Sequence, residues 1–582
     1  MHTKRLLITL SFIIFHLSVC LAQQLTITVD SVGTLARQLN DNVKNAISEL
    51  KISGPLNSAD IKVLQQFVGR SKGKNNAEML LTELDLSEVR MQESKGIYRN
   101  MANQLPVSVF ANCKTLEVVI LPDSLEAISK SGFSGCANLR EITIPESVAL
   151  IDDYAFNGCK ALTSIKLPSG LRKIENHAFD GCSSLTGIEV PSLVDVINSH
   201  AFADCTNLEE ISLDCNIDRI ASSVFARCER LGSIQLPATI SSIATDAFNG
   251  CRSLGTVTFP KTLSKIEHRA FQDCASLKSV TIDHVGTLGN DVFKGCTMLS
   301  SVSLGEVAKM GESTFEKCTS LSTVVISGTL TELDEKTFAE CVSLTSVSLP
   351  SSIKTLGDYA FFNCKLLPKI ELPSSLTKIG EHVFQNCGNL QNIRVPNLVK
   401  QIGNDTFNGC ISLDSVLISG FVEKIESNLF RYCHSLRTVT LPVSVKSIGS
   451  NVFEQCSLLR EITLPISVTS IGDNAFEKCV SLTSIVIPPA CTNIGSSAFR
   501  ECNSINRVEL PSSLKKVGGN AFARCTSLGE VVCSSPTPCN ITNSTFKGTN
   551  LGTCKLIVPK GAKDNYRNHK AWGKFVVIVD QF

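Results

Sequence analysis

The chain has 582 residues, of which 43% are hydrophobic and 19% are charged, and its formal net charge is +1 at pH 7. This charge balance argues against a nucleic-acid-binding protein, which would carry an excess of basic residues. The chain also has no long charge run and no low-complexity linker.

Residues 1–22 have the pattern of a secretory signal peptide. Lys4 and Arg5 precede an apolar run from Leu6 to Val19, and we expect cleavage after Ala22. A lipid anchor on Cys20 is the less favoured alternative, because Val19 stands where a bacterial lipoprotein signal has Gly, Ala or Ser. No other apolar run reaches the ~20 residues of a membrane helix. The sequence therefore predicts an exported protein, secreted or at the cell surface, without a transmembrane segment.

Residues 23–108 are predicted to form an N-terminal cap with degenerate repeats. Strands are expected at Leu50–Leu56 and Leu81–Ser87, and a helix at Ser58–Val68 with Ser58 as its N-cap. A second helix is predicted within Val32–Leu50. A cap is expected here because the open end of a stacked repeat would otherwise expose its core.

Residues 109–548 repeat a short motif in which a Phe is followed three residues later by a Cys. The Phe–Cys ladder runs through nineteen such pairs from Phe110 to Cys525, and sixteen of its eighteen steps are 23 residues long. The two steps between Phe271 and Phe315 are 22 residues long. Representative pairs are Phe156/Cys159, Phe179/Cys182, Phe361/Cys364 and Phe453/Cys456. A fixed period of this length predicts a stacked repeat architecture.

Each repeat contains strand and turn signals. Ile165–Leu167 alternates apolar and polar residues, which predicts a half-buried strand, and Pro168 should end it. The following L-x-x-I pattern indicates a second short strand or a tight turn. We therefore expect a mostly β solenoid of about 19–20 coils of 23 residues, right-handed and with a parallel sheet. In the short coils, from Asp283 to Phe315, the Pro is lost, and we hypothesise a bend or docking feature there.

The ladder cysteines are predicted to be reduced. They recur at one interior position, and the Cβ vectors of neighbouring coils run parallel, which suits a disulfide poorly. A buried thiol also packs as a small apolar group. Cys533, Cys539 and Cys554 lie outside the ladder, and a disulfide among these three is left open.

Residues 549–582 are predicted to form the C-terminal cap. They contain the apolar segment Lys555–Pro559, a short helix near Ala562–His569 and a closing strand at Phe575–Val579.

The coil pattern L-x-x-I-x-L-P-x-x-L-x-x-I-G-x-x-A-F-x-x-C resembles the BspA-like leucine-rich repeat family of secreted and surface proteins. The resemblance covers roughly Leu105 to Phe546 and implies a leucine-rich-repeat arc. Members of the family with known roles are adhesins that bind extracellular-matrix proteins, host cells or other microbes. The resemblance therefore implies a protein ligand on a matrix, host or microbial surface.

No catalytic, metal or cofactor site is predicted. The chain has no P-loop, no H-E-x-x-H, no G-x-S-x-G and no EF-hand loop. His177 and His200 are one period apart and should stack on adjacent coils. No third ligand is evident in their register, so they are interpreted as solvated turn residues rather than a metal pair.

The outward positions of the predicted strands lie five and seven residues after each ladder Cys. Of these 38 residues, 18 are Ser or Thr and 11 are charged. Such a surface either solvates a sheet or serves as a platform for a protein, with a glycan as the less favoured ligand because no aromatic residues are available for sugar stacking. Lys369, Glu371 and Arg394 form the best local charge cluster and are the candidate binding residues.

These patterns predict a non-enzymatic exported protein for surface adhesion or recognition. The alternatives are a passive structural surface protein without a specific ligand and, less favoured, a glycan-binding or hydrolytic accessory protein.

Overall fold

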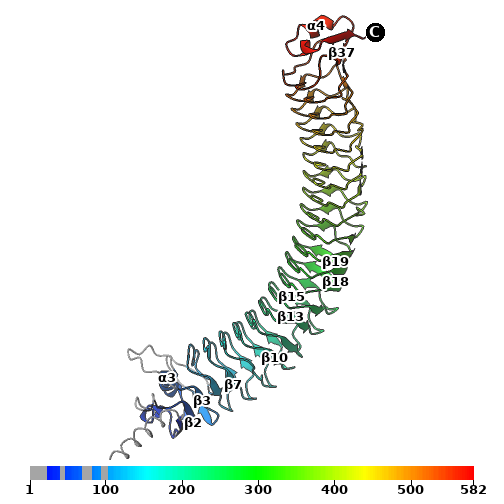
Figure 1. The fold of residues 1–582 in the computed structure, drawn as a ribbon. Helices are drawn as coiled ribbons and strands as arrows, with labels where there is room; N and C mark the ends of the chain where they lie inside the picture. Colours follow the sequence, from blue (N-terminus) through cyan, green and yellow to red (C-terminus); the bar gives the residue numbers. More distant parts are fainter. Residues whose placement is uncertain (1–22, 40–42, 44–45, 69–80, 94–101, 582) are drawn as a thin grey trace, which may run out of the picture. The chain divides into compact units, whose positions relative to one another are not determined.

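The computed structural model describes residues 23–39, 43, 46–68, 81–93 and 102–581. The predicted signal peptide, with Cys20 and Ala22, lies outside the described residues. The chain divides into two compact units, Met1–Thr262 and Leu263–Phe582. Each unit is a parallel-strand β-solenoid with turns of about 23 residues and very little helix (Figure 1). The predicted fold class is thereby confirmed, whereas the right-handed sense and the cap boundaries at 108 and 548 stay predictions.

In the first unit, most coils contribute a main strand and, after the turn, a two-residue second strand. The main strands are β1 (Gln24–Thr28), β2 (Glu49–Leu56), β3 (Glu83–Asp85), β5 (Val118–Ile120), β7 (Glu141–Thr143), β10 (Gly187–Val190), β12 (Glu210–Leu213), β14 (Ser233–Gln235) and β16 (Thr256–Thr258), and β4 (Val89–Met91) pairs with β2. The second strands are β6 (Ala127–Ile128), β8 (Leu150–Ile151), β9 (Lys173–Ile174), β11 (Val196–Ile197), β13 (Arg219–Ile220) and β15 (Ser242–Ile243).

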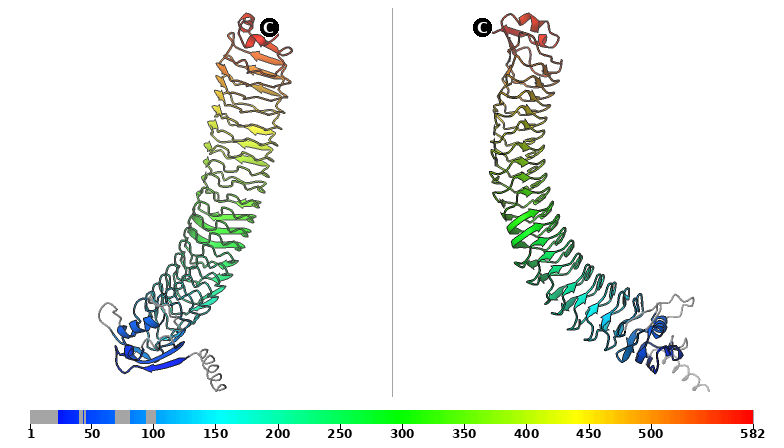
Figure 2. Two further views of the ribbon diagram at one scale, coloured as in Figure 1. Left: turned by 60° about the vertical axis from the view of Figure 1, so that its left-hand side comes forward. Right: turned by 180° about the vertical axis from the view of Figure 1, so that it is seen from behind.

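The second unit repeats this plan (Figure 2). Its main strands are β18 (Ser279–Leu288), β19 (Ser301–Met310), β20 (Thr323–Gly328), β22 (Ser346–Ser348), β25 (Asn392–Val395), β27 (Ser415–Ile418), β29 (Thr438–Thr440), β32 (Ser484–Val486), β34 (Arg507–Leu510), β36 (Glu530–Cys533), β37 (Lys555–Val558) and β38 (Val577–Asp580). Its second strands are β17 (Lys265–Ile266), β21 (Glu332–Leu333), β23 (Thr355–Leu356), β24 (Lys378–Ile379), β26 (Gln401–Ile402), β28 (Lys424–Ile425), β30 (Ser447–Ile448), β31 (Ser470–Ile471), β33 (Asn493–Ile494) and β35 (Lys516–Val517).

The Phe residues of the ladder form a buried column inside each unit. Phe156 and Phe179 have ring centroids 5.2 Å apart, and the rings of Phe179 and Phe202 are 5.3 Å apart and nearly parallel. All three side chains are fully buried. A 23-residue coil can bury this ring only against its neighbours, so the period of the sequence is also the period of the core.

The N-terminal region is partly as predicted. The helix α3 (Ser58–Phe67) forms, but its N-cap is Asn57, whose side chain accepts from the backbone N–H of Asp60 while the Asp60 carboxylate accepts from the N–H of Asn57. Ser58 was therefore the wrong cap, because this reciprocal capping box satisfies two free amides.

The helix predicted within Val32–Leu50 is only partly confirmed in the described part of that segment. The 3-10 helix η2 (Leu35–Arg37) occurs near its start, Val43 is helical, and β2 begins at Glu49. The buried carboxylate of Asp60 accepts from the N–H of Gly33 and of Leu35 and so holds this segment as a turn.

The C-terminal end closes the Phe column. Besides β37 and β38 it has the helix α4 (Lys563–Arg567) and the 3-10 helix η3 (Trp572–Lys574). The Phe546 ring stacks on Phe522 at 5.5 Å and contacts Trp572 at 5.7 Å and Phe575 at 5.2 Å. The predicted helix and closing strand are confirmed, each shorter than or shifted from its expected range by a few residues.

The two 22-residue coils form unusually long strands. β18 and β19 each run for ten residues, and Asp283 and Gly305 stand where most coils have the Pro that ends the strand. Loss of the Pro alone does not lengthen a strand, since β12 and β27 remain four residues long although Asp214 and Ser419 replace it. The hypothesis of a bend or docking feature at these coils stays a prediction. No helix among the described residues is long and apolar enough to cross a membrane.

Candidate functional site

The main strands present regular rows of short polar side chains. Ser279 of β18 is in register with Ser301 of β19, and Thr281 is in register with Ser303. These side chains are exposed, whereas the alternating Val280 is buried. The outward positions inferred from the sequence are therefore correct for these coils, although Val532, at one such position near the C-terminal end, is buried. Each coil of this kind extends the polar surface by one strand spacing of ~4.8 Å.

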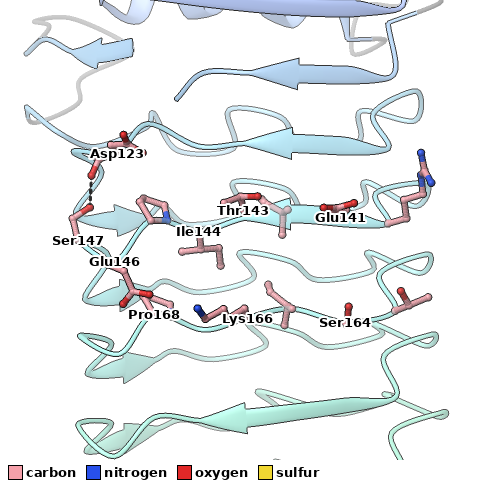
Figure 3. A pocket seen from close by; sticks show the side chains of 14 residues that line it. Asp123, Glu141, Thr143, Ile144, Glu146, Ser147, Ser164, Lys166 and Pro168 are labelled. Atoms are coloured by element: carbon pink, nitrogen blue, oxygen red, sulfur yellow. Dashed lines mark hydrogen bonds between the residues drawn. The ribbon is translucent and has the colours of Figure 1, made fainter. Parts of the chain in front are cut away.

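The rows are not continuous, because some coils lack the main strand. Ile165–Leu167, predicted as a strand, is irregular, and β7 has no hydrogen-bonded neighbour on that side (Figure 3). Ile165 and Leu167 nevertheless remain buried. Burial thus followed the predicted alternation, but the strand prediction itself was wrong.

A second interruption coincides with a missing backbone N–H group. The N–H groups of Thr345 and Gln391 donate to the carbonyls of Ser322 and Pro368 on the preceding coils, at 3.0 and 3.1 Å. Pro368 occupies the equivalent position between them and has no N–H to donate. The coil that contains Lys369 and Glu371 lacks this hydrogen bond and has no main strand between β22 and β25.

The candidate residues Lys369, Glu371 and Arg394 lie on this part of the surface. All three side chains are exposed, and Glu371 and Arg394 occupy equivalent positions on adjacent coils, the latter on β25. Within the described residues, none of the three forms an ion pair with another. The structure thus places them on one face without joining them into a charge network.

An ion-paired cluster lies elsewhere on the same face. Arg507 on β34 contacts Glu509 at 3.0 Å and Glu530 on β36 at 2.7 Å. The sequence showed these three residues as outward charges but did not indicate that they pair. They are exposed by a third or more, so such pairs contribute little to stability.

An open groove lies over β7 and the irregular coil after it in the first unit. It encloses about 830 Å³ and carries charges of both signs (Figure 3), and its lining includes Arg140, Glu141, Thr143, Glu146, Ser164 and Lys166. The Glu146 carboxylate accepts from the backbone N–H and the hydroxyl of Ser169, both at 2.9 Å, and the backbone bond foremost lowers the pKa of Glu146. Glu146 is thus kept ionised as a hydrogen-bond acceptor, which does not suit a general acid.

His177 and His200 stack as predicted, with ring centroids 4.4 Å apart and a 16° angle between the rings. Tyr154 stacks on the other side of His177 at 4.6 Å, and the Nδ1 atom of His177 lies 2.8 Å from an oxygen of Asp180. Burial, and then the neighbouring His177, lower the pKa of His200. Both rings are half-buried, so the solvated-turn interpretation was incomplete. Stacked parallel rings do not point their nitrogens at one ion, and no group of three metal-binding side chains occurs among the residues described.

All 24 cysteines that the structure describes are free, including Cys533, Cys539 and Cys554. In most coils of the ladder, the thiol donates to the carbonyl of the Phe one coil earlier; Cys182 Sγ, for example, lies 3.2 Å from the Phe156 oxygen. Burial raises the pKa of Cys182 far above its ordinary range. These neutral, enclosed thiols are inert packing groups, because reactivity requires an accessible thiolate.

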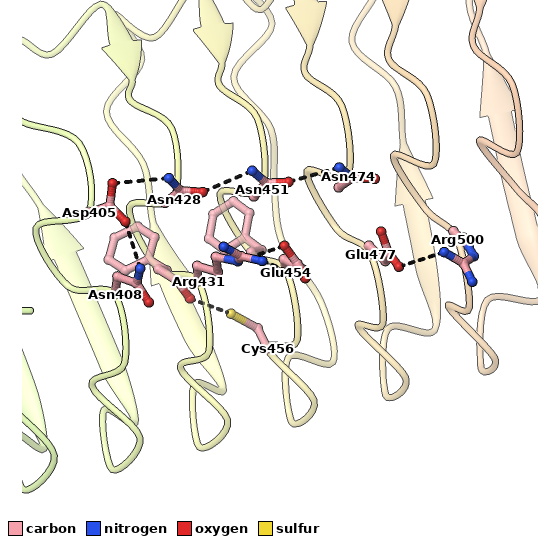
Figure 4. A network of polar contacts seen from close by, with 12 residues as sticks. Asp405, Asn408, Asn428, Arg431, Asn451, Glu454, Cys456, Asn474, Glu477 and Arg500 are labelled. Carbon is pink, nitrogen blue, oxygen red and sulfur yellow. Dashed lines mark hydrogen bonds and ion pairs between the residues drawn. The ribbon is translucent and has the colours of Figure 1, made fainter. Parts of the chain in front are cut away.

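A row of amides, which the sequence analysis missed, stabilises the turns before the ladder Phe residues (Figure 4). Asn428 donates to Asp405 at 3.1 Å, Asn451 to Asn428 at 3.0 Å, and Asn474 to Asn451 at 3.0 Å. All four residues have φ between 54° and 60°, the left-handed region that Asn and Asp tolerate best. Their common position, two residues before the Phe, was the available signal.

Comparison with known proteins gives a family match. The model of the BspA type leucine rich repeat region matches residues 103–232, 218–344, 331–460 and 446–562. None of the curated proteins matches the chain.

Several solved structures are similar. A leucine-rich repeat protein from Bacteroides ovatus is 31% identical, with a TM-score of 0.53 over 60% of this chain and 90% of that one. One from Eubacterium ventriosum is 20% identical, with a TM-score of 0.35 over 62% and 90% of the two chains. A leucine rich cell surface protein from Faecalibacterium prausnitzii is 24% identical, with a TM-score of 0.32 over 60% and 88%.

Proposed function

Because the chain belongs to the BspA-type leucine-rich repeat family, as the sequence predicted, we propose that it is an exported recognition protein. It binds a protein on a matrix, host or microbial surface through the exposed face of its main strands. Proteins of this family and fold are typically non-catalytic, and the mixed, hydrogen-bonded carboxylates of the groove are consistent with a binding surface.

The observation that carries this proposal is the register of the outward rows. Ser279, Ser301 and Thr323 occupy successive strands at one position, and short hydroxyl side chains leave the face open to a partner. A repeated face of this kind gains affinity from many weak contacts, since each coil adds an equivalent row.

Lys369, Glu371 and Arg394 are the proposed first contact site on this face. Their side chains are exposed, and the charges are not neutralised by one another. Charged groups of this kind select a partner with complementary charges and speed its association.

The test is a binding screen with the purified full-length protein as exported. Matrix proteins, microbial surface proteins and glycans are immobilised, and saturable binding is measured by surface plasmon resonance. The triple variant K369A/E371A/R394A is expected to lower the affinity for the bound protein ligand at least about tenfold, which corresponds to ~1.4 kcal/mol. The control K354A/K378A/E381A removes the same charges from exposed positions off the main strands and should change affinity less than about twofold.

Two results would contradict the proposal. Absence of saturable binding to every protein and glycan would favour a passive structural component. Saturable binding to a glycan alone would assign the face to carbohydrate instead of protein.

A further inference from the structure

Four successive turns of the second unit carry large apolar side chains in solvent. Leu398, Phe421, Val443 and Ile466 are 54%, 73%, 88% and 77% exposed. They lie in the corresponding turns of four consecutive coils, one residue per coil, at the tenth or eleventh residue after the ladder Cys. These four side chains are called the turn ridge below.

The core does not require apolar residues at these positions. In the two coils before the ridge the corresponding turns read Pro-Ser-Ser, with Ser351 and Ser374 exposed. After the ridge, one coil reads Pro-Pro-Ala at residues 488–490, and the next returns to Pro-Ser-Ser with Ser512 exposed. Since the same turn folds with serine, the ridge is a departure of four neighbouring coils from the common pattern. Exposed apolar residues gathered in this way mark an interaction surface.

Hydrogen bonds between adjacent turns make the ridge continuous. The N–H of Phe421 donates to the Val399 carbonyl at 2.9 Å, Ser444 Oγ donates to Val422 at 2.9 Å, and Ser467 Oγ donates to Val443 at 2.9 Å. With adjacent coils ~4.8 Å apart, the four side chains span roughly 15 Å.

A row of charges runs beside the ridge. Lys400, Glu423 and Lys446 occupy equivalent positions on three of the coils, and Thr469 follows on the fourth. Glu423 and Lys446 form an exposed ion pair of 2.7 Å. The row is therefore positive, negative, positive and neutral along the four coils.

We propose that the turn ridge docks against the same ridge of a second copy of this chain, in antiparallel orientation. A two-fold axis between Phe421 and Val443 places Phe421 against Val443 of the second copy and Leu398 against its Ile466. The same axis places Glu423 against the second copy's Lys446 and Lys400 against its Thr469. Every apolar side chain then meets an apolar one, and no like charges meet, as a two-fold interface requires.

The charge row and the size of the ridge favour a second copy of this chain as the partner. Moving the axis by half a coil in either direction sets Glu423 against Glu423 or Lys446 against Lys446, so only one central register avoids repulsion. An anionic membrane is disfavoured because Glu423 offsets the charge of Lys446, whereas surface-binding helices and loops carry a clear basic excess. The ridge is much smaller than the ~800 Å² per partner of a stable interface. The association is therefore weak and reversible, and becomes significant where copies are concentrated.

The experiment is sedimentation velocity of the purified full-length protein over a wide concentration range. The unchanged protein should show a reversible monomer–dimer equilibrium. The variant L398S/F421S/V443S/I466S, which adopts the serine of the neighbouring turns, should raise the dimer dissociation constant at least about tenfold. The control L193S/M298S/L366S/V486S, which replaces four other exposed apolar side chains, should change it less than about threefold.

A charge exchange distinguishes the second copy from any other partner. E423K and K446E should each weaken self-association, because each brings like charges together twice across the axis. An equimolar mixture of the two variants should recover association within about threefold of the unchanged protein, because every cross pair is then opposite in charge. A monomer at every concentration, a mixture that associates no more tightly than its components, or ridge-dependent binding to lipid vesicles would overturn the proposal.

Discussion

The Phe column provides the sharpest test of what holds each unit together. Phe430 is fully buried, and its ring centroid lies 5.6 Å from that of Phe407 and 5.5 Å from that of Phe453. Replacing Phe430 with Ala removes a ring from the middle of this stack. A buried Phe→Ala change costs ~3–5 kcal/mol. We expect the upper half of that range, because hydrogen bonds between coils prevent the neighbouring rings from closing the cavity.

The control is the same substitution nine residues earlier. Phe421 is 73% exposed, so F421A should change the free energy of unfolding by less than ~0.5 kcal/mol. Measured below the concentration of self-association, the two variants differ only in where the ring is removed.

The measurement is native-state hydrogen exchange, read coil by coil, together with urea unfolding. A solenoid couples mainly to its nearest neighbours, so F430A should lose protection mostly between residues 407 and 476. A cost below ~1 kcal/mol, or a loss of protection spread evenly over the chain, would refute the view that stability resides in ring-on-ring contacts of adjacent coils.

Three further predictions follow from single groups. Burial raises the pKa of the Cys387 thiol from its ordinary 9.0 to about 12. Above pH 9 the thiol ionises in the unfolded chain but not in the folded one, so the free energy of unfolding should fall as the pH rises towards 12, by up to ~1.4 kcal/mol per pH unit for each such thiol. Urea titrations between pH 8 and 10.5 that show no decline would contradict this. N451A removes the hydrogen bond that Asn451 donates to Asn428 and the one that it accepts from Asn474, and it should lower the free energy of unfolding by ~1–3 kcal/mol. N451G should recover only the part of this loss that comes from the positive φ, and melting curves of the two variants measure the difference. G158A should cost ~1–2 kcal/mol from backbone strain alone, since φ is +71° and the added Cβ meets no atom closer than 3.9 Å; a crystal structure of the variant should show an unchanged coil.

The sequence predicted the interior of the molecule well because packing repeats with the chain. A Phe at every 23rd residue can only be buried if it lies on the Phe of the coil before, as the stacks around Phe179 and Phe430 show. The outward rows followed from the same register, because a residue between two buried strand positions must face solvent.

Local conformation was predicted less well, because it depends on single hydrogen bonds. The helix that begins at Ser58 has Asn57 as its N-cap, and Asp60 completes the capping box. The Asp60 carboxylate also accepts from the N–H of Leu35 and fixes the turn there, in a segment for which the pattern had suggested a longer helix. The missing strand beside β7 has no visible cause in the residues around Ile165. The gap after β22 coincides with the missing N–H of Pro368, whereas the coil of Glu461 also lacks its main strand and has Arg460 at that position. Hydrophobic periodicity reports burial and is insensitive to such details.

The candidate site was hardest to predict for a related reason. A residue that every coil needs, such as Phe430, reveals the core and nothing about a ligand. A residue that only a few neighbouring coils carry, such as Phe421 where other turns have Ser, has no role in the common fold and therefore requires another explanation. Selection for binding acts on such departures, while selection for stacking acts on the repeat. If F421S destabilised the monomer as strongly as F430A, the distinction between the two kinds of position would fail, and with it the argument that the turn ridge is an interface.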